Sequence, residues 1–298
     1  MKIGDISCKK GERAFGYLTV DETRGRIPVQ IPINILRGEK DGPTFLLDAA
    51  IHGDENIGTV GIGQLLRKIS PKEIKGTLIA VPVVNTGGFE FGQRECPWDG
   101  KDINRQDEGK ADGTTAQRIA YTYFKEVISK ADFYLDIHSG GPDAYVWYTI
   151  YLEDVGGSPE VVQKSREMAL AFGLTDIFSR TPWKGTIKEV ATRKGIPSIT
   201  PEIGGGADFM WHGQEQVDIC EQCIRNVMIY LGMLEGPAPE PVPTQMLDRF
   251  IWLRSEHDGY YYLDVQVGDT VRQGQPLGRI TDYEGNVLQG VQSPADGR

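Results

Sequence analysis

The sequence predicts an α/β protein with a mixed, largely parallel sheet and helices on both faces, followed by a small β-barrel-like domain. Three observations support this prediction. Short continuous apolar runs, which are typical of strands buried on both faces, alternate with helical patterns. A proline-rich segment then interrupts the chain at residues 236–243. Beyond it, strand patterns and turn signals occur without a helical pattern.

The predicted strands of the α/β part are recognised by their apolar patterns. Residues 27–36 alternate in part, as a half-buried strand does. Residues 45–51 and 78–84 are short continuous apolar runs, which favour strands with both faces covered. Two further strands are predicted at residues 133–137 and 196–203.

Helices are predicted between these strands. Residues 56–69 form the first, and Pro71 follows its end. Residues 115–129 and 159–172 form two more. A last helix has its apolar residues at spacings of three and four, which marks one face: Val217, Cys220, Ile224, Val227, Leu231 and Leu234. Residues 86–113 are rich in Gly, Asp and Arg without any period, so we expect a long functional loop there.

The predicted domain boundaries follow the change in composition. Residues 1–235 form the α/β domain, and residues 236–243 form a semi-rigid linker. Residues 244–298 form the small β-domain. The chain ends at Arg298, where a barrel of this kind usually continues into another strand, so truncation of this domain stays open.

One motif of the small domain suggests a function that the sequence then excludes. The stretch Val267–Gly274 resembles the barrel of lipoyl and biotinyl carriers. Such carriers need an acceptor lysine, and no lysine follows Lys194. The barrel shape is therefore expected without the carrier function.

The composition limits the classes of partner. The 298 residues carry a formal net charge of -10, with a pI near 5.0. This charge disfavours nucleic acid and anionic membranes, because both require a basic surface. No apolar run approaches the roughly 18 residues of a membrane-spanning helix, and residues 1–15 lack the apolar core of a signal peptide. Four cysteines are too few for a disulfide framework. We therefore expect a cytoplasmic protein.

Candidate functional residues lie where predicted strands end: His52, Glu55, His138 and Glu202. In open α/β sheets, ligands bind beyond the carboxyl ends of the strands, so these side chains can converge. Two imidazoles and one carboxylate suit catalytic zinc, which keeps a fourth position for water or substrate. The pattern His-x-x-Glu is short, and a single histidine at a strand end is often only a hydrogen-bonded surface group. The glycines that follow His138 and Glu202 favour the metal, because they admit close approach of a ligand.

The order of these motifs resembles the succinylglutamate desuccinylase/aspartoacylase family, which is related to the zinc carboxypeptidases. The resemblance covers nearly the whole chain, including the small β-domain. It implies a zinc carboxypeptidase-like fold and one zinc ion per chain, bound by His52, Glu55 and His138. It also implies hydrolysis of the amide bond of a small N-acyl amino acid.

The resemblance assigns roles to five more residues. Glu202 matches the general acid/base, and Arg94 matches the arginine that polarises the scissile carbonyl. Asp102 matches a carboxylate that orients a zinc-ligating histidine. Asn104 and Arg105 match the pair that binds the substrate carboxylate. The chemistry of these side chains is consistent with the implied roles. A carboxylate beside an activated water molecule can move the proton of that water. The planar guanidinium group of an arginine can bind a carboxylate with two parallel hydrogen bonds.

Non-catalytic interpretations of the same residues stay open. Arg94 and Arg105 could be solvated loop charges or members of surface ion pairs. Asp102 could simply form a turn beside Gly100. The sequence Gln106-Asp107-Glu108 departs from the apolar, proline-containing stretch that often follows the Asn-Arg pair, so the acyl group and the amino acid are not predicted.

Other tempting features favour structural roles. Cys220 and Cys223 have C-x-x-C spacing, but they lie in the last helix and Cys220 shares its apolar face, so core packing is expected. His212 and His257 are expected to be structural, although His212 is close in sequence to Glu202. The sequence does not decide whether the aromatic group is core, pocket wall or interface: Tyr145, Trp147, Tyr148 and Tyr151.

Two alternative functions remain. A non-catalytic metal-binding module would need neither Glu202 nor Arg94, and both are present. A zinc carboxypeptidase that acts on peptides would share the carboxylate-binding residues, but a small domain near the mouth of the site would exclude long chains. Homo-oligomerisation stays open.

Overall fold

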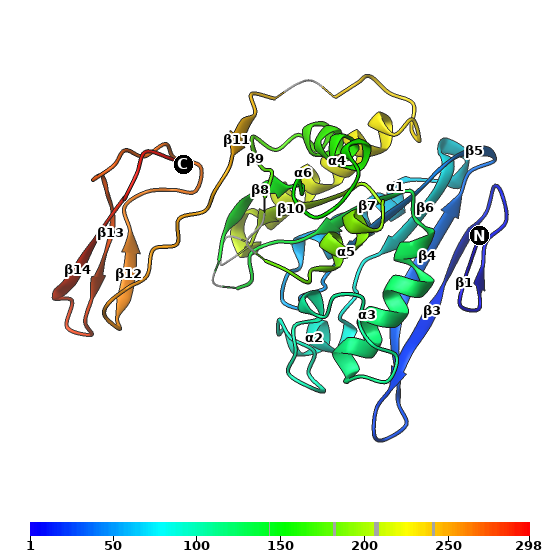
Figure 1. Ribbon diagram of the computed structural model, residues 1–298, viewed down its shortest axis with the longest axis horizontal. Coiled ribbons are helices and arrows are strands. Elements are labelled where there is room, and N and C mark those ends of the chain that lie inside the picture. The colour runs from blue at the N-terminus through cyan, green and yellow to red at the C-terminus, as the bar shows by residue number, and fades with distance from the viewer. Residues whose placement is uncertain (143, 181–182, 206–208, 240–241) are drawn as a thin grey trace. The chain divides into compact units, whose positions relative to one another are not determined.

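The computed structural model describes residues 1–142, 144–180, 183–205, 209–239 and 242–298. Its internal contacts divide the chain into two compact units, Met1–Asp248 and Arg249–Arg298. The first unit contains a nine-stranded sheet, and the second contains a three-stranded sheet (Figure 1).

The large sheet is mixed and largely parallel, as predicted. Its order is β11-β9-β8-β10-β7-β5-β6-β4-β3. The central strands β6, β5, β7 and β10 are parallel to one another, whereas β4 pairs antiparallel with β6, β3 with β4, and β8 with β10. The strands are β3 (Arg13–Glu22), β4 (Pro28–Arg37), β5 (Lys40–Ala49), β6 (Lys75–Val81), β7 (Phe133–Ile137), β8 (Val146–Ile150), β9 (Asp176–Phe178), β10 (Ser198–Gly204) and β11 (Gln245–Leu247). A short hairpin of β1 (Lys2–Ile3) and β2 (Ile6–Ser7) precedes them.

Helices cover both faces of this sheet (Figure 1). One apolar core lies under α1 (Ile57–Lys68), α4 (Pro159–Phe172) and α6 (Phe209–Tyr230). The other lies under α3 (Thr115–Glu126) and α5 (Ile187–Arg193). Successive residues of one strand enter opposite cores, as Leu46 and Leu47 do. This two-sided burial is the physical reason for the continuous apolar runs in the sequence.

Several expected elements match closely, and others do not. The strand at 133–137 and the helix at 159–172 have the predicted bounds. The expectation that residues 86–113 form only a loop is wrong, because α2 (Thr86–Phe91) and a short 3₁₀ turn (Ile103–Arg105) lie within it. The side chain of Asn85 accepts a hydrogen bond from the Gly88 N–H and so caps α2.

The smaller unit contains β12 (Tyr260–Leu263), β13 (Pro276–Thr281) and β14 (Val287–Gln292), paired antiparallel in that order. No helix occurs among its residues, which the structure describes throughout. The contact boundary after Asp248 differs from the expected start at residue 244, because β11 pairs in parallel with β9 and so belongs to the large sheet.

The cysteines and the helices agree with a protein that has neither a disulfide framework nor a membrane-spanning helix among its described residues. Cys8, Cys96, Cys220 and Cys223 are all free and buried, and Cys220 lies in the core beneath α6. Within the described residues, no helix combines the length and the apolar character that crossing a membrane requires.

Candidate active site

The parallel register of β7 and β10 sets two candidate residues side by side. The backbone N–H of His138 donates to the Pro201 carbonyl at 2.9 Å, and the Ile203 N–H donates to the His138 carbonyl at 3.0 Å. His138 and Glu202 are therefore direct partners across the two strand ends. Because side chains of paired residues leave a sheet on the same face, both lie on the face that α3 and α5 cover.

His52 and Glu55 come from the turn between β5 and α1. Glycine is required within this turn, because a Cβ at Gly53 would lie 2.0 Å from the backbone carbon of Gly88 in α2. The two backbones are thus in close contact, which fixes the turn against α2. A second glycine, Gly58, lets α1 lie against β5 and β7, since its Cβ would lie 2.7 Å from side-chain atoms of both strands.

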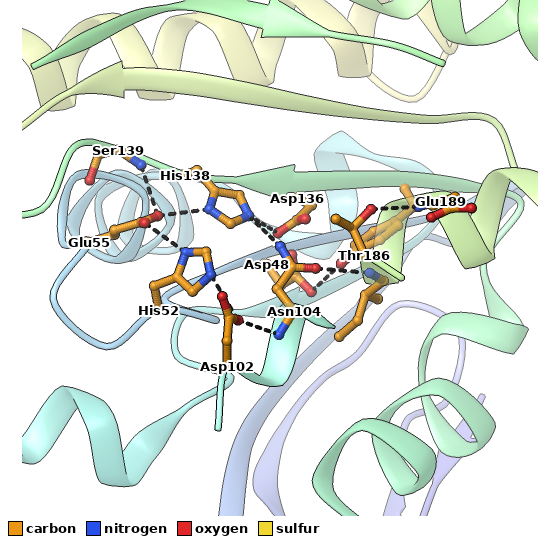
Figure 2. A network of polar contacts seen from close by, with 12 residues as sticks. Asp48, His52, Glu55, Asp102, Asn104, Asp136, His138, Ser139, Thr186 and Glu189 are labelled. Carbon is orange, nitrogen blue, oxygen red and sulfur yellow. Dashed lines mark hydrogen bonds and ion pairs between the residues drawn. The ribbon is translucent and has the colours of Figure 1, made fainter. Parts of the chain in front are cut away.

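His52, Glu55 and His138 form one buried cluster that could hold a metal ion, with their ligand atoms all within 4.8 Å of one another. Nδ1 of His52 lies 2.7 Å from Oε1 of Glu55, and Nδ1 of His138 lies 2.8 Å from Oε2 (Figure 2). The Ser139 N–H also donates to Glu55 Oε2, at 3.2 Å. Both imidazoles therefore turn the same nitrogen toward the shared carboxylate.

The opposite nitrogens face a second set of polar groups. Nε2 of His52 lies 3.2 Å from Oδ1 of Asp102, and Nε2 of His138 lies 3.2 Å from Oδ1 of Asp136 (Figure 2). The Asn104 amide nitrogen lies 3.3 Å from His138 Nε2. Metal-binding histidines characteristically have such a carboxylate behind them, because it fixes the orientation of the ring. Asp102 also accepts the Asn104 N–H at 2.8 Å, so it forms the turn and contacts the histidine.

The charges of this cluster shift several pKa values. Burial alone would raise the pKa of Glu55, but the two histidines outweigh it and lower that pKa strongly. Burial would lower the pKa of His52, yet Glu55 and Asp102 raise it. For His138 the same balance holds, with Asp136 the strongest carboxylate that raises its pKa. A metal cation bound by these nitrogens would therefore compete with protons for them.

Glu202 is partly buried, and burial raises the pKa of its carboxyl to about 7. His138, His52 and Lys188 act in the opposite direction, and the charge of Glu55 adds to the rise. On the other side of β10, Tyr148 of β8 is the direct partner of Glu202. Burial, and next the charge of Glu202, raise the pKa of the Tyr148 phenol, which remains protonated at neutral pH.

Both candidate arginines lie at this site. Arg94 donates to Glu55 Oε1 at 3.2 Å and to Asp102 Oδ2 at 3.1 Å. Arg105 donates to the Asn104 carbonyl at 2.8 Å, and its NH1 lies 3.9 Å from Asp102 Oδ2. The two guanidinium groups thus stand beside one carboxylate.

Sequence reasoning missed three charged residues here. Asp48 and Asp136 are adjacent across β5 and β7, and both are fully buried. The hydroxyls of Tyr123 and Tyr134 donate to Asp48. A carboxylate inside an apolar strand run was the available signal, because such groups are rarely buried without a partner. Lys188 of α5 is also buried, and its helix gave no clear pattern.

Two acidic residues after Arg105 form ion pairs with residues near the end of α5. Asp107 lies 2.7 Å from Arg193, and Glu108 lies 2.9 Å from Lys194. Both ion pairs are at the surface. These two acidic side chains are therefore paired with cations near the end of α5.

The aromatic group divides between two environments. Tyr151 is buried in the core beneath α4 and α6, and Trp147 packs against the same core. Tyr148 stands beside Glu202. Tyr145 stacks on Trp147 with ring centroids 6.2 Å apart. The side chain of His212 lies outside the described residues, and His257 is exposed.

The fold and this cluster define the class: an α/β protein with a candidate metal centre at the carboxyl ends of its central strands. The model of the "succinylglutamate desuccinylase/aspartoacylase catalytic domain" matches residues 41–231. The chain therefore belongs to the succinylglutamate desuccinylase/aspartoacylase family. A relative from Halomonas elongata, named N-alpha-acetyl-L-2,4-diaminobutyric acid deacetylase, is 31% identical over 261 residues, which are 85% of this chain and 75% of that protein.

Solved structures have the same fold. A succinylglutamate desuccinylase/aspartoacylase from Rhodobacter sphaeroides has a TM-score of 0.84 and 27% identity, covering 98% of this chain and 92% of that one. A product-bound ectoine utilization protein from Ruegeria pomeroyi has a TM-score of 0.86 and 26% identity, with the same 98% and 92% coverage. The Halomonas relative is named as a deacetylase, and the Rhodobacter structure is named as a desuccinylase/aspartoacylase.

Proposed function

We propose that this chain is a zinc-dependent deacylase that hydrolyses the amide bond of a small N-acyl amino acid. The observation that carries the proposal is the convergence of His52, Glu55 and His138 beside Glu202 at the ends of neighbouring strands. A module that only held a metal would have no need of Glu202. A deacylase does need such a carboxylate, because it must move a proton to the leaving amine.

The donor set fits zinc. Two imidazole nitrogens and one carboxylate leave a fourth position, which is the pattern of catalytic zinc sites. The carboxylates of Asp102 and Asp136 behind the two rings strengthen the fit. Zinc held there would lower the pKa of its water toward about 7. We expect one zinc per chain.

The remaining residues have complementary roles in this proposal. Glu202 takes the proton from the attacking water and delivers it to the leaving amine, and a pKa near 7 keeps both of its protonation states populated. Arg94 stabilises the negative charge that develops on the carbonyl oxygen. Asn104 and Arg105 hold the α-carboxylate of the substrate. Asp102 orients His52.

The proposed substrate class is small N-acyl amino acids, with the acetyl group of the Halomonas relative's substrate as the first to test. A cytoplasmic location stays a prediction. The absence of nucleic-acid and membrane partners is also a prediction, and the sequence leaves homo-oligomerisation open.

The test is an assay for free amine released by the zinc-loaded protein. The panel combines N-acetyl, N-succinyl and N-formyl amino acids, N-α-acetyl-L-2,4-diaminobutyrate and short peptides. We expect turnover of at least one N-acyl amino acid, and turnover by the Glu202→Gln variant that is lower by roughly two to four orders of magnitude. Faster cleavage of peptides than of single N-acyl residues would favour a carboxypeptidase instead.

A further inference from the structure

Tyr148 lies beside Glu202 on the side away from His138. In the antiparallel pair of β8 and β10, Tyr148 is the direct partner of Glu202. Side chains of directly opposite residues leave a sheet on the same face, so the phenol and the Glu202 carboxyl share one face. The preceding residue, Trp147, packs against the core on the other face. Glu202 is thus flanked by His138 on one strand and by Tyr148 on the other.

The ring of Tyr148 packs on one side and is accessible in part. It contacts Phe178 of β9 edge to face, with the ring centroids 5.1 Å apart. Phe178 is buried, whereas Tyr148 is only partly buried. The contact with Phe178 positions the ring, and the accessible part of Tyr148 can meet a ligand.

The charges that act on the phenol are negative. Burial raises the pKa of Tyr148, and the charges of Glu202 and then of Glu55 act in the same direction. The hydroxyl is therefore protonated at neutral pH, and its oxygen can accept a hydrogen bond as well as donate one. A negative potential favours a ligand group with a polar N–H, or an amine, over an anion.

The proposed reaction brings such a group next to Glu202. The bond between the carbonyl carbon and the amide nitrogen breaks as Glu202 gives its proton to that nitrogen. The lone pair of the nitrogen must point at Glu202 at that moment, so its N–H must point elsewhere. A hydrogen-bond acceptor beside Glu202 would hold this N–H and would stabilise the positive charge that develops on the nitrogen.

Resting on the proposed function, we propose that Tyr148 is a further catalytic residue, whose phenol oxygen accepts a hydrogen bond from the N–H of the scissile amide. The contact keeps the lone pair of the nitrogen directed at Glu202. After the bond breaks, the same oxygen contacts the amine that leaves. The group that Tyr148 recognises is therefore the reacting nitrogen of the substrate.

The test compares an amide with the ester in which oxygen replaces the N–H, using the zinc-loaded full chain. The best N-acyl amino acid of the panel is paired with its O-acyl analogue, as N-acetyl-L-alanine is with O-acetyl-L-lactate. Tyr148→Phe keeps the ring and its contact with Phe178 but removes the phenol oxygen. We expect kcat for the amide to fall by about 10- to 100-fold, as for the loss of a hydrogen bond to a developing charge. For the ester, which has no N–H, kcat should change by less than about threefold.

Tyr145→Phe is the matched control, because the ring of Tyr145 stacks on Trp147. This variant should leave both rates unchanged. Zinc content is measured for each variant and should equal that of the unmutated protein. Equal losses for amide and ester in Tyr148→Phe would overturn the inference, because the phenol would then act on a group that both substrates share. An unchanged amide rate would overturn it as well.

A binding measurement separates this inference from the proposed function. Calorimetry compares the amino acid product with the 2-hydroxy acid of the same shape, such as L-alanine with L-lactate, and requires no turnover. The unmutated protein should prefer the amine, and Tyr148→Phe should lose most of that preference. Such a preference without cleavage of any substrate would refute the deacylase and leave the contact with the nitrogen intact. Cleavage of the amide without any effect of Tyr148→Phe on rate or binding would do the reverse.

Discussion

At the scale of single residues, our proposal gives the two carboxyls of the site different roles, one that would hold a metal and one that would move protons. Glu55 contacts both histidines directly, whereas Glu202 reaches the cluster from the neighbouring strand. The two carboxyls also have opposite pKa shifts, down for Glu55 and up for Glu202. Two carboxyls whose environments push their pKa values apart characteristically take different catalytic roles.

Glu202→Gln tests this separation. The amide keeps the size and polarity of the side chain but cannot carry a proton. We expect metal content to stay unchanged and kcat to fall by roughly two to four orders of magnitude. Elemental analysis and the amine-release assay measure the two quantities. Activity within tenfold of the unmutated protein would mean that another group moves the proton.

Arg105→Ala tests recognition of the α-carboxylate. The best monocarboxylate substrate of the panel is compared with its carboxamide analogue, so that the α-carboxylate is the only charge that differs. The unmutated protein should prefer the acid by about 30-fold or more, because its analogue leaves a partly buried guanidinium without an anion. The variant should lose this preference mainly because it binds the acid substrate more weakly. Equal kcat/KM for acid and amide in the unmutated protein would exclude carboxylate anchoring.

At the scale of elements, the turn of Gly53 determines whether His52 and Glu55 meet. We expect Gly53→Ala to destabilise the fold by about 1–3 kcal/mol, because the added Cβ would overlap the backbone of α2. The zinc affinity should fall as well, since both ligands belong to the displaced turn. Chemical denaturation and a competitive chelator assay measure the two effects.

Gly63→Ala is the control within α1. A Cβ at Gly63 would have its nearest neighbour, Arg67 NH1, at 3.9 Å. Alanine there should stabilise the helix by up to about 1 kcal/mol and leave zinc affinity unchanged. If both variants behaved alike, contact of the turn with α2 would not position the ligands.

The elements also explain how much the sequence could predict. Strands β5, β6 and β7 were predictable because burial on both faces produces continuous apolar runs. β3 was missed because it lies at the edge of the sheet and much of its surface is exposed. α5 has only 7 residues and buries a lysine, so it lacks the period of an amphipathic helix.

The site itself was predictable only in part. The ends of predicted strands identified His52, Glu55, His138 and Glu202 as candidates that could converge, and the structure brings them together. The contact of Asp136 with His138 depends on the side-chain face of β7. The position of Lys188 depends on how α5 packs, which sequence spacing does not determine.

At the scale of the whole molecule, the larger unit contains everything that the proposed site requires. Both apolar cores consist of residues from Met1–Asp248 alone. A chain that ends at Asp248 should therefore unfold cooperatively and bind one zinc per chain with unchanged affinity. Thermal unfolding with and without zinc measures this, with the full chain as reference. Loss of cooperative unfolding would show that the larger unit depends on Arg249–Arg298.

The central claim is that His52, Glu55 and His138 hold a catalytic zinc ion, and metal content measured together with turnover tests it most directly. We expect about one zinc per chain in the unmutated protein and in Glu202→Gln. His52→Ala should lose both the metal and the activity while the fold persists, because the cores do not include this side chain. Full zinc occupancy in folded His52→Ala protein would contradict the account.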